Sequence, residues 1–194
     1  MVWAWIRVVL GPPGTPMAGR TKSHDGEGGR PRSARTLSGC RSEASASMDL
    51  DTKVKLNIYS TLERTAQAPS AADVAQALHI PTTEVEDAFE RLHQKRLLVP
   101  EPGDATRIRM APPFSGVATP FRVDVGDKTY FANCAWDALG VAAALHRDAE
   151  VHASDAFSGE SIRLEVRNGQ PVHEPCVIHF AVPAARWWDD IIHT

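Results

Sequence analysis

The sequence has few cysteines, no long hydrophobic run and no marked excess of either charge. Its three cysteines, Cys40, Cys134 and Cys176, form no even, closely spaced set. This excludes a disulfide framework and favours free thiols in a reducing, cytoplasmic compartment. The 194 residues include 21 basic and 24 acidic ones, and the formal net charge is −3. The whole chain therefore has no electrostatic preference for nucleic acid or an anionic membrane, and its 43% hydrophobic content is that of a globular protein.

Several familiar functional motifs are also missing from the sequence. It contains no glycine-rich phosphate loop, no nucleophile elbow and no dinucleotide-binding fingerprint. The eight histidines show no metal-ligand spacing, so no zinc site is predicted. The apolar opening, residues 1–10, is interrupted by Arg7 and is too short to cross a bilayer. It also lacks the basic start of a secretion signal, so we expect no membrane partner.

Residues 1–47 are predicted to be a disordered leader. They hold seven of the 21 basic residues but three of the 24 acidic ones, together with seven of the 13 glycines. From residue 11 onward they show no apolar periodicity, so they cannot bury enough surface to offset the entropy of ordering. Two further interpretations stay open: a basic tail that contacts nucleic acid, and a misassigned start upstream of Met48.

Residues 49–110 predict three short helices and a β-hairpin. Apolar residues recur at every fourth position of the first helix, at Val54, Ile58 and Leu62. A capping-box pattern from Ser70 to Asp73 starts a second helix, and Thr82 or Thr83 caps a third. Residues 97–99 and 107–110 read as the two strands of the hairpin. This order of elements resembles a winged helix-turn-helix, a pattern that indicates a fold more strongly than a function.

The charges of the third predicted helix argue against DNA reading. This is the helix that would enter the major groove. Its acidic residues are Glu84, Glu86, Asp87 and Glu90. They outnumber Arg91 and Lys95, and Arg107 and Arg109 of the hairpin are too few to reverse the repulsion of phosphate. We therefore favour a structural or lid module, with a winged-helix transcriptional regulator as the alternative and nucleic acid as an unfavoured partner.

Residues 112–194 predict a second module after a linker at Pro112 and Pro113. Apolar and polar residues alternate from Phe121 to Val125, which indicates a half-buried strand, and residues 135–145 form an apolar helix. Later strands are expected at 151–157, 162–166 and 176–182, before a terminal helix at 184–192. The predicted fold class is α+β: a winged-helix-like helical module, then a mixed or antiparallel sheet domain with one internal helix.

The junction between strand and internal helix carries the candidate chemistry. If Asn133 caps the helix, Cys134 takes its first position and Asp137 lies one turn further on the same face. A helix N-terminus favours a thiolate, and a neighbouring carboxylate can move a proton. The alternative is a small buried cysteine beside an ordinary acidic residue of the first turn. The spacing alone leaves both open.

Residues 130–139 resemble the catalytic segment of the organomercurial (alkylmercury) lyases. In that family an aromatic strand leads into Cys-Ala-x-Asp-x-Leu at the start of an apolar helix, as it does here at Cys134 and Asp137. The likeness continues over 150–159 and covers about residues 50–194. In the family the helix-turn-helix-like module packs on the catalytic domain and does not read DNA.

The resemblance implies protonolytic cleavage of a carbon–mercury bond, giving R–H and Hg²⁺. Cys134 then matches the thiolate nucleophile that holds mercury transiently. Asp137 matches the acid that transfers protons beside the metal. The implied partners are an organomercurial and a low-molecular-weight thiol, which acts as co-reductant or product acceptor, and no cofactor is expected. A soft thiolate suits a soft metal.

In the family a second catalytic cysteine follows the terminal helix, and residues 186–194 of this sequence, which correspond to that region, contain no cysteine. Cys176 shares a strand face with Ile178 and Phe180, so we predict that it is a core residue. Two explanations stay open: the domain of residues 112–194 is truncated at its C-terminus, or this member lacks the second cysteine. The second explanation gives an alternative function, a degenerate member that binds a mercurial or soft metal through Cys134 without turnover.

Overall fold

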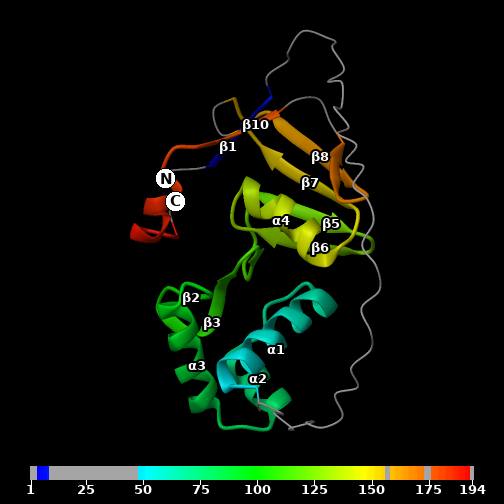
Figure 1. The fold of residues 1–194 in the computed structure, drawn as a ribbon. Helices are drawn as coiled ribbons and strands as arrows, with labels where there is room; N and C mark the ends of the chain where they lie inside the picture. The colour runs from blue at the N-terminus through cyan, green and yellow to red at the C-terminus, as the bar shows by residue number, and fades with distance from the viewer. Residues whose placement is uncertain (1–3, 9–47, 156–157, 173–175, 193–194) are drawn as a thin grey trace, which may run out of the picture. The chain divides into compact units, whose positions relative to one another are not determined.

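The computed structural model describes residues 4–8, 48–155, 158–172 and 176–192 (Figure 1). Most of the leader predicted to be disordered lies outside these residues. The exception is strand β1 (Ala4–Val8), which pairs antiparallel with β10 (Cys176–Phe180). Aromatic and β-branched residues, which favour strands, dominate this short stretch. Its partner strand lies at the other end of the chain, which is why local periodicity gave no sign of the pairing.

Three helices open the part of the structure that follows residue 47. They are α1 (Leu50–Thr65), α2 (Ala71–Leu78) and α3 (Thr82–Gln94). The predicted stripe of α1 is buried, as are the apolar faces of α2 and α3. The capping box of α2 is present: Ser70 Oγ accepts the Asp73 N–H at 3.2 Å, and the Asp73 carboxylate accepts the Ser70 N–H at 2.8 Å. Together these helices form the helical module of the chain.

The start of α3 differs from the prediction. Pro81 takes the N-cap position and no side chain caps the helix. Thr82 and Thr83 are already inside the first turn, so neither hydroxyl occupies the position from which a cap accepts the free N–H groups.

An eight-stranded antiparallel sheet follows the helices. Its strand order is β2-β3-β4-β6-β5-β7-β8-β9, and each pair of neighbouring strands runs antiparallel. The strands are β2 (Val99–Glu101), β3 (Asp104–Ala111), β4 (Phe114–Ser115), β5 (Phe121–Val125), β6 (Lys128–Ala132), β7 (Ala149–Ser154), β8 (Ser161–Arg167) and β9 (Gln170–Val172). Helices beside an antiparallel sheet give the α+β class that the sequence predicts.

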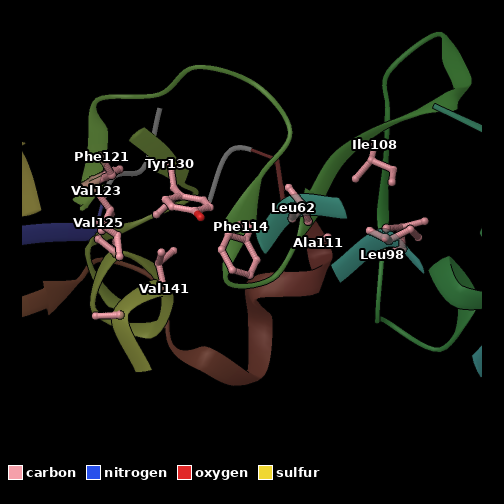
Figure 2. Packing of buried hydrophobic residues seen from close by; sticks show 14 of the residues in the cluster. Leu62, Leu98, Ile108, Ala111, Phe114, Phe121, Val123, Val125, Tyr130 and Val141 are labelled. Carbon is pink, nitrogen blue, oxygen red and sulfur yellow. The ribbon is translucent and has the colours of Figure 1, made fainter. Parts of the chain in front are cut away.

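The residues predicted to form a linker instead form a turn within this sheet. Residues 112 and 113 join β3 to β4, whose ends pair through Ala111 and Phe114. The sheet therefore continues from the hairpin into the second module, and one hydrophobic core spans both. Figure 2 shows the ring of Phe114 between that of Tyr130, 5.7 Å away, and the side chain of Leu62.

The internal helix α4 (Ala135–Leu145) packs against the apolar face of the sheet. Val123, Val125 and Val151 on the strands and Val141 on α4 are all fully buried. The helix also passes close to the turn at 112–113, because a Cβ added at Gly140 would come within 3.0 Å of Pro113 Cβ. The terminal helix is a 3₁₀ helix, η1 (Ala184–Asp189), shorter than the predicted 184–192. This packing holds the first turn of α4 beside the β3–β4 turn.

Candidate functional site

Cys134 itself begins α4. Strand β6 ends at Ala132, and Cys134, in extended backbone geometry, is the N-cap residue. Its Sγ accepts the Asp137 backbone N–H at 3.4 Å. The sequence predicted Asn133 in this role, with Cys134 inside the helix. Asn133 instead precedes the N-cap, and its Nδ2 donates to the Phe114 carbonyl at 3.3 Å and to Asp137 Oδ2 at 3.0 Å.

The two predicted catalytic residues lie together. Both the Cys134 and the Asp137 side chains are half-buried, within one helical turn. The Asp137 carboxylate lies close enough to the thiol for its charge to raise the pKa of Cys134, and the Asn133 amide donates to the same carboxylate. Cys134 is partly exposed, and it has a proton acceptor within one helical turn.

Burial decides the protonation of both groups. Burial and, to a smaller extent, the Asp137 charge raise the pKa of the Cys134 thiol to about 11. Backbone N–H groups at the start of α4 lower it by less. The expectation of a thiolate stabilised by the helix N-terminus is therefore wrong for the free protein. Burial also raises the pKa of Asp137, while its hydrogen bonds to Asn133 and Cys134 oppose that rise. At neutral pH the Cys134 thiol is therefore protonated.

A tyrosine from the helical module stands near this pair. Burial raises the pKa of the Tyr59 hydroxyl, and the nearby Asp137 carboxylate raises it further. Its Oη donates to the Pro112 carbonyl at 2.8 Å, and its ring meets Phe114 edge-on at 6.2 Å. Sequence reasoning missed Tyr59, since nothing local connects α1 to the site. The available signal was that the sequence has only two tyrosines. The second one, Tyr130, also joins the sheet to α1, because its hydroxyl donates to the Glu63 carbonyl at 2.8 Å.

An apolar pocket of about 440 Å³ includes a residue of the same helical turn. It is lined by Trp136, residues 180–184 and Trp187. Trp136 is 61% exposed although it lies between a buried alanine and the half-buried Asp137. The Phe180 and Trp187 rings are 5.0 Å apart, and Trp187 Nε1 donates to the Val182 carbonyl at 2.8 Å. Trp136 lies within the lyase-like segment, residues 130–139, where the sequence alone assigns it no role.

The remaining predicted candidates are less fully described. Cys40 lies outside the described residues. Cys176 is in β10, opposite Val8, but its side chain is outside the described set, so its predicted place in the core stays a prediction. Among the described residues, no three potential metal ligands gather in one place. In the same residues we find no helix with the length and apolarity needed to cross a membrane.

Comparison with known proteins points to the same family as the sequence segment around Cys134. The family model described as MerB, alkylmercury lyase, matches residues 114–194. A solved structure described as the crystal structure of the mercury-bound form of MerB2 is 27% identical, with a TM-score of 0.53. The match covers 66% of this chain and 61% of that one, so this chain spans less than two thirds of that protein's length. The curated proteins gave no match.

The family match includes every element that forms the site on the sheet side. Residues 114–194 contain β4, β6, the start of α4 and the pocket. Together, the family model and the mercury-bound structure confirm, for residues 114–194, the resemblance to the alkylmercury lyases that the sequence indicates.

Proposed function

We propose that this chain is an alkylmercury lyase that cleaves carbon–mercury bonds by protonolysis in the cytoplasm. The observation that carries the proposal is the pairing of a half-buried thiol, Cys134, with a half-buried carboxylate, Asp137, at the start of α4, where the sulfur caps the Asp137 N–H at 3.4 Å. The family match over this segment supports the same reaction. The substrate is an organomercurial, R–Hg–X, and mercury is part of that substrate.

The reaction needs one proton, and the site holds it. In the first step the Cys134 sulfur forms a bond to mercury while X leaves, and the thiol proton passes to the Asp137 carboxylate. In the second step protonated Asp137 gives that proton to the carbon of R. The C–Hg electron pair becomes the new C–H bond, and R–H departs. The raised pKa of both groups suits this transfer, because burial keeps the thiol protonated until mercury binds and makes the Asp137 carboxylate a better proton acceptor.

An external thiol completes the cycle. After R–H departs, mercury stays bonded to the Cys134 sulfur. Two low-molecular-weight thiols take the metal as a bis-thiolate; one of their two protons returns to Cys134 and the other passes to solvent. Every step is a ligand exchange or a proton transfer, so the proposal involves no resident cofactor. Soft sulfur donors are the natural acceptors for mercury.

Asn133 is a positioning residue in this scheme. Its amide joins the Phe114 carbonyl to Asp137 Oδ2 and so fixes the orientation of the carboxylate. It also lowers the pKa of Asp137 against the effect of burial. We infer that this bond keeps Asp137 able to accept the thiol proton and then release it to carbon.

The helical module, in this proposal, is a winged-helix-like unit with a structural role. Two of the cations available for DNA, Arg91 and Lys95, pair with Asp51 at 2.8 and 2.7 Å. Tyr59 and Tyr130 join α1 to the sheet beside the site. A mobility-shift assay on a random DNA duplex at low salt tests this role. Salt-dependent binding would favour the regulator instead.

The lyase proposal is tested by turnover. Purified protein is incubated with phenylmercuric acetate and excess dithiothreitol, and benzene is measured by gas chromatography. Cys134→Ser is the matched control, because serine is a good N-cap and preserves the start of α4. We expect benzene from the wild type and none above background from Cys134→Ser. Equal amounts from both would overturn the proposal.

A second candidate is a binding protein without turnover. It is favoured by the single cysteine side chain described at the site, since one sulfur gives mercury one protein ligand. The two candidates differ in one experiment. Stoichiometric retention of phenylmercury by the wild type, lost in Cys134→Ala and accompanied by no benzene, would select the binding protein.

A further inference from the structure

The pocket beside α4 is hydrophobic, and no charged residue lines it. Its size, about 440 Å³, lies within the range of about 300–1,000 Å³ typical of small-molecule sites. Three aromatic rings, from Trp136, Phe180 and Trp187, contribute to its lining. Aromatic faces and edges offer extensive contact to another ring and little to a small alkyl group.

Two of these rings are held in place by contacts within the lining. The indole N–H of Trp187 donates to the Val182 carbonyl, which satisfies its polar atom and fixes the ring plane. The Phe180 ring packs against it at 5.0 Å. A preformed aromatic wall binds without the entropy cost of ordering its side chains.

The third ring comes from the first turn of α4, the turn that begins at the reactive cysteine. Trp136 follows Cys134 by two positions, and helical geometry puts such Cα atoms roughly 5–6 Å apart. Its indole is 61% exposed. A large apolar surface left open beside a reactive group is what a ligand of matching character would cover.

We propose that this pocket is a subsite for the organic group of the substrate and that it selects aryl over small alkyl groups. The inference rests on the proposed lyase function, since mercury on Cys134 would be the other point of attachment. The phenyl ring of an arylmercurial enters between Trp136 and Trp187. A methyl group leaves the same space to water.

Binding can be measured separately from turnover. In Cys134→Ser, the five indole N–H signals are followed by ¹H–¹⁵N NMR while benzyl alcohol is added, with ethanol as the alkyl probe; Trp136→Phe and Trp187→Phe assign two of the signals. We expect benzyl alcohol to move the Trp136 and Trp187 signals, and ethanol to leave them in place. No movement at tens of millimolar benzyl alcohol would overturn the subsite even if the enzyme is active.

Selectivity is the second measurement. The ratio of kcat/KM for phenylmercury to that for methylmercury should fall about tenfold in Trp136→Ala. Trp188→Ala is the matched control: it removes the neighbouring indole, which lies over Arg96 at 5.7 Å and does not line the pocket. It should keep the wild-type ratio.

The outcomes separate the two proposals. An unchanged ratio in Trp136→Ala, with both substrates turned over, overturns the subsite and leaves the lyase in place. Absence of turnover with either substrate, together with movement of the indole signals by benzyl alcohol, overturns the lyase and supports an aromatic-binding site.

Discussion

The helical module and the sheet domain each place an aspartate in the first turn of a helix, and the two aspartates behave oppositely. Asp51 of α1 accepts hydrogen bonds from Arg91 at 2.9 Å and Lys95 at 2.7 Å, and these cations lower its pKa. Asp137 of α4 accepts a hydrogen bond from the neutral Asn133 amide, and burial raises its pKa. A helix N-terminus favours negative charge in both places. The partners therefore decide which carboxylate is a structural anion and which can carry a proton.

The largest effect should come from removing the proton carrier. Asp137→Asn should lower kcat/KM for phenylmercury by about 10²–10⁴-fold, because the amide cannot accept the thiol proton. Asp51→Asn is the matched change in the other region and should leave turnover unchanged. Benzene release measures both. Wild-type activity in Asp137→Asn would remove Asp137 from the mechanism and abolish the contrast.

The next effect should come from the amide that holds Asp137. Asn133→Ala removes one hydrogen bond to the carboxylate, so the pKa of Asp137 should rise further and activity near neutral pH should fall about tenfold. The pH–rate profile distinguishes this from a loss of folding, since its acidic limb should move to higher pH. Asn57→Ala, the same change in the helical module, should leave the profile in place. A profile that keeps its position in Asn133→Ala would contradict the role.

A smaller effect, on stability alone, should follow from the structural aspartate. Asp51→Asn should lower the free energy of unfolding by about 1 kcal/mol at neutral pH. The partner side chains of Arg91 and Lys95 are 43% and 56% exposed, so solvent screens the pair. Urea unfolding monitored by circular dichroism measures the loss. An unchanged midpoint would show that the ion pairs add nothing to the fold.

The smallest effect should be a pair of opposite pH dependences. The folded pKa of Asp51 lies below its ordinary value of 3.8, so its contribution to stability is present above 3.8 and is lost as pH falls through the folded pKa. The folded pKa of Asp137 lies above 3.8, so its contribution is present below 3.8 and is lost as pH rises through the folded pKa.

Urea unfolding between pH 3 and 7 checks this pair. Relative to wild type, Asp51→Asn should lose its disadvantage as the pH falls, whereas Asp137→Asn should gain stability as the pH rises. Parallel curves for the two variants would contradict the contrast between the aspartates.

The local parts of the fold were predictable from the sequence. The apolar stripe from Val54 to Leu62 predicted α1 correctly, because an apolar residue at every fourth position indicates a helix whatever element it packs against. The capping box at Ser70 is equally local. The alternation from Phe121 to Val125 gave β5, and the β5 side chains at odd positions are buried as expected.

The parts that depend on distant residues were not predictable. Asparagine is a better N-cap than cysteine by preference. In the structure the Asn133 amide donates to the Phe114 carbonyl, and Cys134 caps the helix. The protonation of Cys134 followed from burial by packed elements and not from its position on the helix. The approach of Tyr59 likewise depends on how α1 packs beside the site.

The sulfur of Cys134 takes part in two interactions that compete: a hydrogen bond within α4 and, in the proposed reaction, a bond to mercury. In the free protein it satisfies the Asp137 N–H, one of the helix donors that would otherwise lack an acceptor. Mercury bound to the same atom withdraws electron density from that contact. The backbone amide of Asp137 should therefore report whether mercury is bound. Its proton chemical shift and its rate of exchange with solvent should both change when mercury binds to the sulfur, without any added label.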